Sequence, residues 1–117
     1  MKRLLLVIGL EDYFDDDTKR AAARLNIELD GPHSMQSTVE HSPHLRAQDG
    51  VIIDLRYQAH EIFEFVQDLV FFGIPFVIAS HEKQESIDYP GYSFTSDLDD
   101  LRALLEGLNR RTDFTIH

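Results

Sequence analysis

Three apolar runs divide the chain, and each has the length of a β-strand. They are Arg3–Gly9 (RLLLVIG), Val51–Leu55 (VIIDL) and Ile74–Ser80 (IPFVIAS). Runs of this kind, without regular polar alternation, are typical of strands that are covered on both faces of a sheet. Asn26–Leu29 and Tyr92–Thr95 predict two shorter strands. The weak apolar content of Asn26–Leu29 favours a position at the edge of the sheet.

Two segments with helical periodicity lie between these strands. Thr18–Leu25 offers a small apolar face, and the aspartates at positions 15–17 are possible N-caps for it. Ala59–Phe72 has the strongest helical pattern in the chain, and Gly73 follows it as a C-terminal cap. Both segments are therefore expected to pack against the sheet.

The remaining segments differ in how clearly they predict structure. Asp97–Arg111 predicts a last helix capped by Ser96, with acids in its first turn, arginines in its last turn and one stripe of leucines: Leu98, Leu101, Leu105 and Leu108. Ser34–Gln48 has helical material that Pro43 should break or restart. His81–Gly91 is polar and too short for a clear helix.

The alternation of strands and helices predicts an α/β fold. Such a pattern implies a parallel sheet with right-handed crossovers and helices on both faces. In sheets of this kind the functional site lies at the carboxyl ends of the strands. Asp54 is placed at this edge, where its carboxylate can reach solvent and so avoid being buried without a partner. We expect one domain over residues 1–117.

The composition limits the classes of function. A net charge of −10 disfavours binding to duplex nucleic acid or to anionic membranes. The chain has no cysteine, which excludes disulfides and thiolate catalysis. No apolar stretch is long enough for a membrane span, and no signal peptide is evident. A soluble, cytoplasmic protein is the expectation.

Four stretches, in order and at nearly the usual spacing, give the chain a resemblance to a known family. KRLLLVIG, DGVIIDLR, GIPFVIAS and TSDLDDLRALL resemble the response-regulator receiver domain of two-component signalling. The resemblance implies a flavodoxin-like fold with sheet order 2-1-3-4-5. It also implies that Asp54 occupies the phospho-acceptor position and Ser80 the hydroxyl switch position.

The rest of that family's active site is missing from the sequence. The two adjacent acids that hold Mg²⁺ at the end of the first strand correspond here to Ile8 and Gly9. Glu11 and Asp12 are weak substitutes, because the loop would have to bend back over the strands. The family's lysine is absent near residues 94–96, and the link between the fourth and fifth strands is too short for a full crossover helix. The resemblance is therefore to a degenerate receiver, or pseudo-receiver.

Other candidate sites are less specific. His41 and His44 have a metal-ligand spacing, but a proline lies between them and no third ligand is evident. The acidic run over residues 11–17 lacks the glycine and terminal glutamate of a calcium loop. Ser80, His81 and Asp54 are the residue types of a hydrolytic triad without a nucleophile elbow. The sequence thus favours neither an enzyme nor a bound cofactor.

The strongest helix carries more apolar residues than one sheet-facing stripe needs. Phe63, Val66 and Val70 fall on an adjoining flank, and Tyr92 and Phe94 should lie near a region left bare by a missing or reduced fourth helix. These residues predict an interaction surface for a protein partner or a homodimer.

Three hypotheses follow from these patterns. The first is a pseudo-receiver that signals by binding, without Mg²⁺-dependent phosphorylation. The second is a working receiver phosphorylated on Asp54 with Mg²⁺ held by Glu11 or Asp12. The third is a small flavodoxin-like enzyme or ligand binder.

Overall fold

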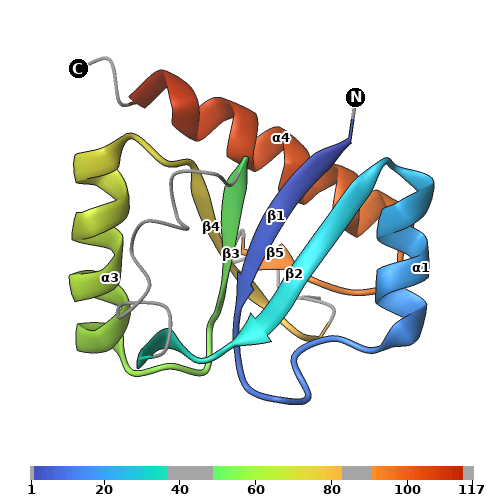
Figure 1. The fold of residues 1–117 in the computed structure, drawn as a ribbon, viewed down its shortest axis with the longest axis horizontal. Helices are drawn as coiled ribbons and strands as arrows, with labels where there is room; N and C mark the ends of the chain where they lie inside the picture. The colour runs from blue at the N-terminus through green and yellow to red at the C-terminus, as the bar shows by residue number, and fades with distance from the viewer. Residues whose placement is uncertain (1, 37–48, 83–90, 115–117) are drawn as a thin grey trace.

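The computed structural model describes residues 2–36, 49–82 and 91–114, and Figure 1 shows the arrangement of their helices and strands. The elements in chain order are β1 (Arg3–Ile8), α1 (Asp16–Arg24), β2 (Ile27–His33), β3 (Gly50–Asp54), α3 (Ala59–Phe72), β4 (Phe76–Ser80), β5 (Tyr92–Ser93) and α4 (Leu98–Phe114).

The five strands form one parallel sheet in the order β2-β1-β3-β4-β5. This confirms the predicted order and a Rossmann/flavodoxin-like α/β architecture. The two apolar runs of β1 and β3 lie in the interior of the sheet, where Leu6 pairs with Val51 and Ile8 with Ile53. Because the sheet is parallel, the carboxyl ends of its central strands meet at one edge.

Successive residues of β1 and β3 enter different cores, as the two-residue period of a strand requires. Leu5, Val7 and Ile52 pack into the core under α1 and α4. Leu6, Ile8, Val51 and Ile53 pack into a second core with Phe65 and Leu69 of α3. Figure 1 shows α3 and α1 on opposite sides of the sheet. The continuous apolar pattern of β1 and β3 is thus explained by burial on both faces.

Several boundaries differ from the prediction. β2 continues beyond Leu29, because it stays paired with β1 as far as Ile8 and His33 after a shift in register. At the other edge, Thr95 does not belong to β5. Its Oγ1 accepts a hydrogen bond from the amide of Asp97 and donates one to Asp100, so it belongs to the turn that precedes α4.

The cap of the last helix was also predicted one residue too early. The amide of Asp99 donates to Oδ1 of Asp97 at 2.8 Å, and the Asp97 carbonyl accepts from Leu101. Asp97, rather than Ser96, is therefore the N-cap. The other two cap predictions are correct, since Asp15 accepts from the amide of Thr18 and Gly73 ends α3 in the left-handed conformation.

Some predictions fall outside the described residues. They are the helical material over most of Ser34–Gln48, the pair His41 and His44, and the missing or reduced crossover helix between β4 and β5, since residues 83–90 are not described. Among the residues that are described, no helix is both long and apolar enough to cross a membrane.

Candidate functional site

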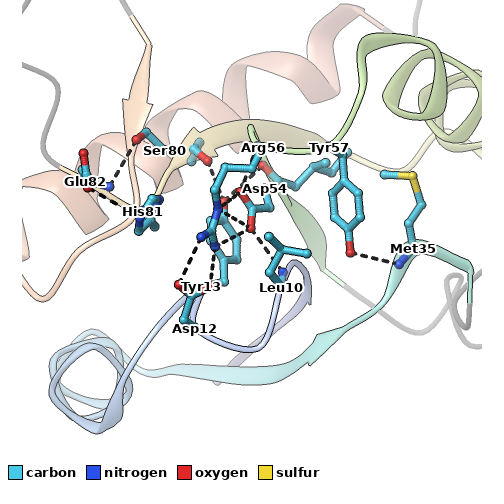
Figure 2. A network of polar contacts seen from close by, with 12 residues as sticks. Leu10, Asp12, Tyr13, Met35, Asp54, Arg56, Tyr57, Ser80, His81 and Glu82 are labelled. Atoms are coloured by element: carbon cyan, nitrogen blue, oxygen red, sulfur yellow. Dashed lines mark hydrogen bonds and ion pairs between the residues drawn. The ribbon is translucent and has the colours of Figure 1, made fainter.

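Asp54 is the last residue of β3 and lies at the carboxyl edge of the sheet, between the ends of β1 and β4. The sequence predicted this position. The expectation that its carboxylate reaches solvent is wrong, because the side chain is completely buried, with no exposed surface. A buried carboxylate needs strong hydrogen-bond donors, because an isolated charge inside a protein is very unfavourable. Its partners therefore define the site (Figure 2).

The main partner of Asp54 is Arg56, two residues further along the same turn. Nη2 of Arg56 donates to Oδ2 of Asp54 at 2.8 Å, and Nε lies 3.1 Å from Oδ1 and 3.2 Å from Oδ2. A guanidinium group that meets a carboxylate through two nitrogens forms one of the strongest ion pairs in proteins. The turn after β3 thus brings the guanidinium group of Arg56 back to the carboxylate of Asp54 at the end of the strand.

Backbone amides complete the environment of this carboxylate. The amide of Arg56 donates to Oδ1 at 3.0 Å, and the amide of Leu10, from the loop after β1, donates to Oδ2 at 3.2 Å. Burial by itself raises the pKa of Asp54, but the hydrogen bonds from Arg56 and Leu10 outweigh it. The net result is a pKa below the ordinary value, so the group is an ionised, fully bonded carboxylate.

Arg56 also binds Asp12, the second acid that the sequence singled out. Nη2 of Arg56 lies 2.9 Å from Oδ1 of Asp12, and Nη1 lies 3.2 Å from Oδ2. This hydrogen bond lowers the pKa of Asp12, and the two carboxylates together raise the pKa of Arg56. The loop after β1 does therefore bend back towards Asp54. Arg56 connects Asp12 of this loop to Asp54.

The two weak candidates for metal ligands, Glu11 and Asp12, are not grouped as a metal site. Asp12 reaches Asp54 through Arg56, while Glu11 is exposed at the loop surface. Within residues 2–36, 49–82 and 91–114, no three acidic or histidine side chains are close enough together to hold an ion.

Tyr13 fills the space beside this ion pair. Its hydroxyl lies 2.8 Å from the carbonyl oxygen of Ala79 and 3.1 Å from that of Ile53, at the ends of β4 and β3. Its ring lies against Gly9, where an added Cβ would be only 2.4 Å from Cδ2 of Tyr13. A side chain at position 9 would clash with the ring. Tyr13 and Gly9 are therefore matched in shape.

The hydroxyl of Ser80 lies at the end of β4, the predicted position. Its Oγ accepts a hydrogen bond from the amide of Glu82 at 3.1 Å, which stabilises the turn after the strand. Nε2 of His81 lies 3.7 Å from the Glu82 carboxylate. Since Asp54 is held by Arg56, the contacts described for these residues are not those of a hydrolytic triad.

The predicted interaction residues fall into two groups. On α3, Phe63 and Val70 are 62% and 56% exposed, while Val66 is half-buried against the second core. Phe94 was wrongly placed at the surface, because it is 1% exposed and packs against the rings of Tyr13 and Phe14.

Tyr92, the remaining residue of the predicted surface, lies beside Phe94 in the chain but is not equally enclosed. It is half-buried against the first core, next to Gly107 of α4. The exposed part of the predicted surface is therefore on α3.

The sequence reasoning missed Arg56 and Tyr13. A signal for Arg56 was present in the order Asp-Leu-Arg, because a turn directly after a buried acid can bring the third residue back to it. Tyr13 stands with Phe14 in an otherwise acidic loop, which is a sign of an anchored loop. Neither signal would have identified the atoms that these side chains contact.

Comparison with known proteins gives a likeness of fold. No protein-family model and no curated protein matches the chain. A sensor protein from Polaromonas sp. JS666, known from its crystal structure, is 15% identical and aligns over 98% of this chain and 99% of its own, with a TM-score of 0.57. A de novo designed Rossmann 2x3 fold protein, solved by NMR, is 16% identical over 94% of this chain and 90% of its own, with a TM-score of 0.53.

Proposed function

We propose that this chain is a receiver-like signalling module that acts by binding another protein, without conventional Mg²⁺-dependent phosphorylation of Asp54. The observation that carries this proposal is the Arg56 guanidinium bound to the fully buried Asp54 carboxylate. Arg56 supplies from within the chain the positive charge that a metal ion supplies in a working receiver. The proposed role of Asp54 is to anchor the turn between β3 and α3.

The chemistry of phosphoryl transfer supports this proposal. A carboxylate that attacks a phosphoryl group must be accessible to the donor, and metal ions and cations must neutralise the equatorial oxygens. Here both oxygens of Asp54 already accept hydrogen bonds, and Asp12 is paired with the same arginine. Phosphorylation would first require the loss of these bonds in a site with no exposed carboxylate surface.

The packing of Tyr13 adds support from a second direction. A working receiver needs carboxylates at the end of β1, where this chain has Ile8 and Gly9. The Tyr13 ring occupies the space into which a side chain at position 9 would extend. The role proposed for this edge of the sheet is therefore structural, and the function is assigned to the outer surface. The chain is proposed to be neither an enzyme nor a cofactor carrier, and to act in the cytoplasm.

The runner-up is a working receiver phosphorylated on Asp54. The observation in its favour is that the Asp54 carboxyl group lies at the end of β3, with the Ser80 hydroxyl at the end of the neighbouring strand. It requires Arg56 to leave the carboxylate when a metal and a phosphoryl group arrive.

An amide NMR titration distinguishes the two. The wild-type chain, Asp54→Asn and Arg56→Ala receive millimolar Mg²⁺ and then beryllofluoride, a mimic of a phosphoryl group on aspartate. We expect the wild-type spectrum not to show saturable shifts around residues 10–12, 54–56 and 80. The Arg56 Nε–H signal should be displaced from its wild-type position in Asp54→Asn, which detects the ion pair directly.

Two results would overturn the proposal. One is a set of saturable beryllofluoride shifts in the wild type that are lost in Asp54→Asn. The other is an Arg56 Nε–H signal that is the same in both proteins. Arg56→Ala is the matched control, since metal binding only in that variant would identify Arg56 as the group that excludes the ion.

A further inference from the structure

The outer side of α3 exposes large apolar side chains that the two cores do not use. Phe63, Val70 and Phe71 are 62%, 56% and 82% exposed, in contrast to Phe65 and Leu69 of the same helix, which are buried. Phe63 and Val70 are seven residues apart and so lie on one side of the helix, two turns from each other. Apolar surface of this kind on a soluble domain usually marks a binding site.

The acids of α3 lie on the other flank of the helix. Glu61, Glu64 and Asp68 are spaced by three and four residues and therefore share one side. They line a hollow of about 310 Å³, whose remaining wall is formed by Met35, Gln36 and Phe65. A long cationic side chain can place its aliphatic stem on Met35 and Phe65 and its charge beside the acids.

The C-terminal end of α3 is also negative. The helix has no basic residue in its last turn, so its own side chains do not compensate the partial negative charge of its terminal carbonyl groups. Phe71 lies in this last turn, with its ring against Phe72 at a centroid distance of 5.2 Å. An exposed aromatic ring at the negative end of a helix is a favourable place for a guanidinium or ammonium group.

These observations specify the chemistry of one partner. We propose that α3 is the docking helix for a basic amphipathic helix of another protein, whose apolar side packs on Phe63, Val70 and Phe71 and whose lysines or arginines face Glu64 and Asp68. This inference rests on the proposed function, since it names the partner class of the interaction module. It uses a surface separate from the Asp54 site.

The charge of the chain argues for a different protein over a second copy. Each copy has a net charge of −10, and α3 contains three acids but no lysine or arginine. Pairing two such helices would bring like charges together, whereas a basic helix would neutralise them. Complementary charge would also accelerate the encounter with a basic partner at low salt.

The test uses a defined probe and the full chain. An 18-residue peptide with leucines on one helical side and lysines and arginines on the other is titrated into the ¹⁵N-labelled protein. Reference peptides have the same composition in scrambled order, or glutamate in place of every basic residue. We expect saturable amide shifts along residues 61–73 with the amphipathic basic peptide, and weaker binding as salt rises from about 50 to about 300 mM.

Surface variants locate the binding site. Phe63→Ser and Phe71→Ser should each weaken binding about tenfold, the change expected for a contact that contributes about 1.4 kcal/mol to an interface. Glu64→Gln/Asp68→Asn should weaken it about threefold and reduce the salt dependence. The matched controls are Leu55→Ser for exposed apolar surface and Glu28→Gln/Glu106→Gln for the same change in net charge. Both controls should stay within about twofold of the wild type.

The remaining outcomes contradict the inference. Equal binding of the scrambled peptide, or an equal loss in Glu28→Gln/Glu106→Gln, would mean that only overall charge is recognised. An equal loss in Leu55→Ser would mean that the apolar contact is not specific to α3. A dimer detected by sedimentation and abolished by Phe63→Ser would assign the surface to a second copy. Beryllofluoride is then added to the same samples to separate the two proposals. Amide shifts around Asp54 on this addition would overturn the proposed function. The absence of shifts in α3 during the peptide titration would overturn only this inference.

Discussion

Nη2 of Arg56 lies 2.8 Å from Oδ2 of Asp54, and the same guanidinium group extends to Asp12 in the loop after β1. One arginine thus joins the end of the third strand to the loop that follows the first strand. Because Asp54 is fully buried and Asp12 is exposed, the ion pair of Arg56 with Asp54 should be stronger than its ion pair with Asp12. The buried pair of Arg56 and Asp54 is the one expected to stabilise the fold.

Arg56→Ala should lower the free energy of unfolding by about 2 kcal/mol, because it leaves a buried carboxylate with amide donors alone. Arg56→Lys should recover only part of this loss, since an ammonium group cannot donate through two fixed nitrogens. Urea unfolding at pH 7 measures both changes. Arg102→Ala is the control, because its pair with Asp99 is exposed and should be worth less than about 1 kcal/mol. Equal losses in the two alanine variants would contradict the role given to Asp54.

The stability of the protein should depend on pH through Asp54. Its pKa is lower in the folded protein than in the unfolded chain, so the unfolded state binds more protons between the two values. The stabilisation is therefore present above about pH 4, the pKa of an unperturbed aspartate, and is lost as the pH falls through the lower folded-state value. We expect the difference in unfolding free energy between wild type and Asp54→Asn to decrease between about pH 5 and pH 3. A constant difference across this range would argue against a depressed pKa.

Tyr13 should affect stability at alkaline pH. Burial raises the pKa of its phenol well above the ordinary value, and the nearby charge of Asp54 raises it further. The folded state therefore disfavours the phenolate, and stability should decline as the pH rises past about 10. Tyr13→Phe should remove this decline while lowering stability at pH 7 by about 1 kcal/mol through the lost hydroxyl hydrogen bonds.

Tyrosinate absorbance checks the same group independently. At about pH 11 the unfolded chain should contain more ionised tyrosine than the folded chain, and Tyr13→Phe should reduce that difference by about one residue. If the variant and the wild type show the same difference, the phenol of Tyr13 is not protected by the fold.

The central strands, the edge of the sheet at which Asp54 lies and the strongest helix could be predicted from the sequence. The unbroken apolar patterns of β1 and β3 predicted central strands, because only a strand covered on both faces needs such a pattern. The position of Asp54 at the carboxyl edge followed from the same reasoning. The helix bounds of α3 were predicted correctly, since both its periodicity and Gly73 are local signals.

What the sequence could not supply were contacts between distant loops. Phe94 was predicted to be exposed but is buried. Its burial depends on Tyr13 and Phe14, which come from the other end of the chain and could not be placed beside it from the sequence. The role of Arg56 likewise depends on a turn geometry that places its side chain over the preceding acid and beside Asp12. Patterns along the chain report which side of an element is buried, but they do not report which loops meet there.

The fit between Gly9 and Tyr13 also limits how this sequence can change. Gly9→Asp would force a carboxylate into the tyrosine ring, an overpacking that costs about 1–3 kcal/mol or more. Removing the ring first would leave a cavity and two strand-end carbonyls without their donor. Each single substitution is therefore unfavourable, and the end of β1 can accept an acid at position 9 only if both positions change together. Packing therefore couples positions 9 and 13, and the residue at each one limits the side chains that the other can accept.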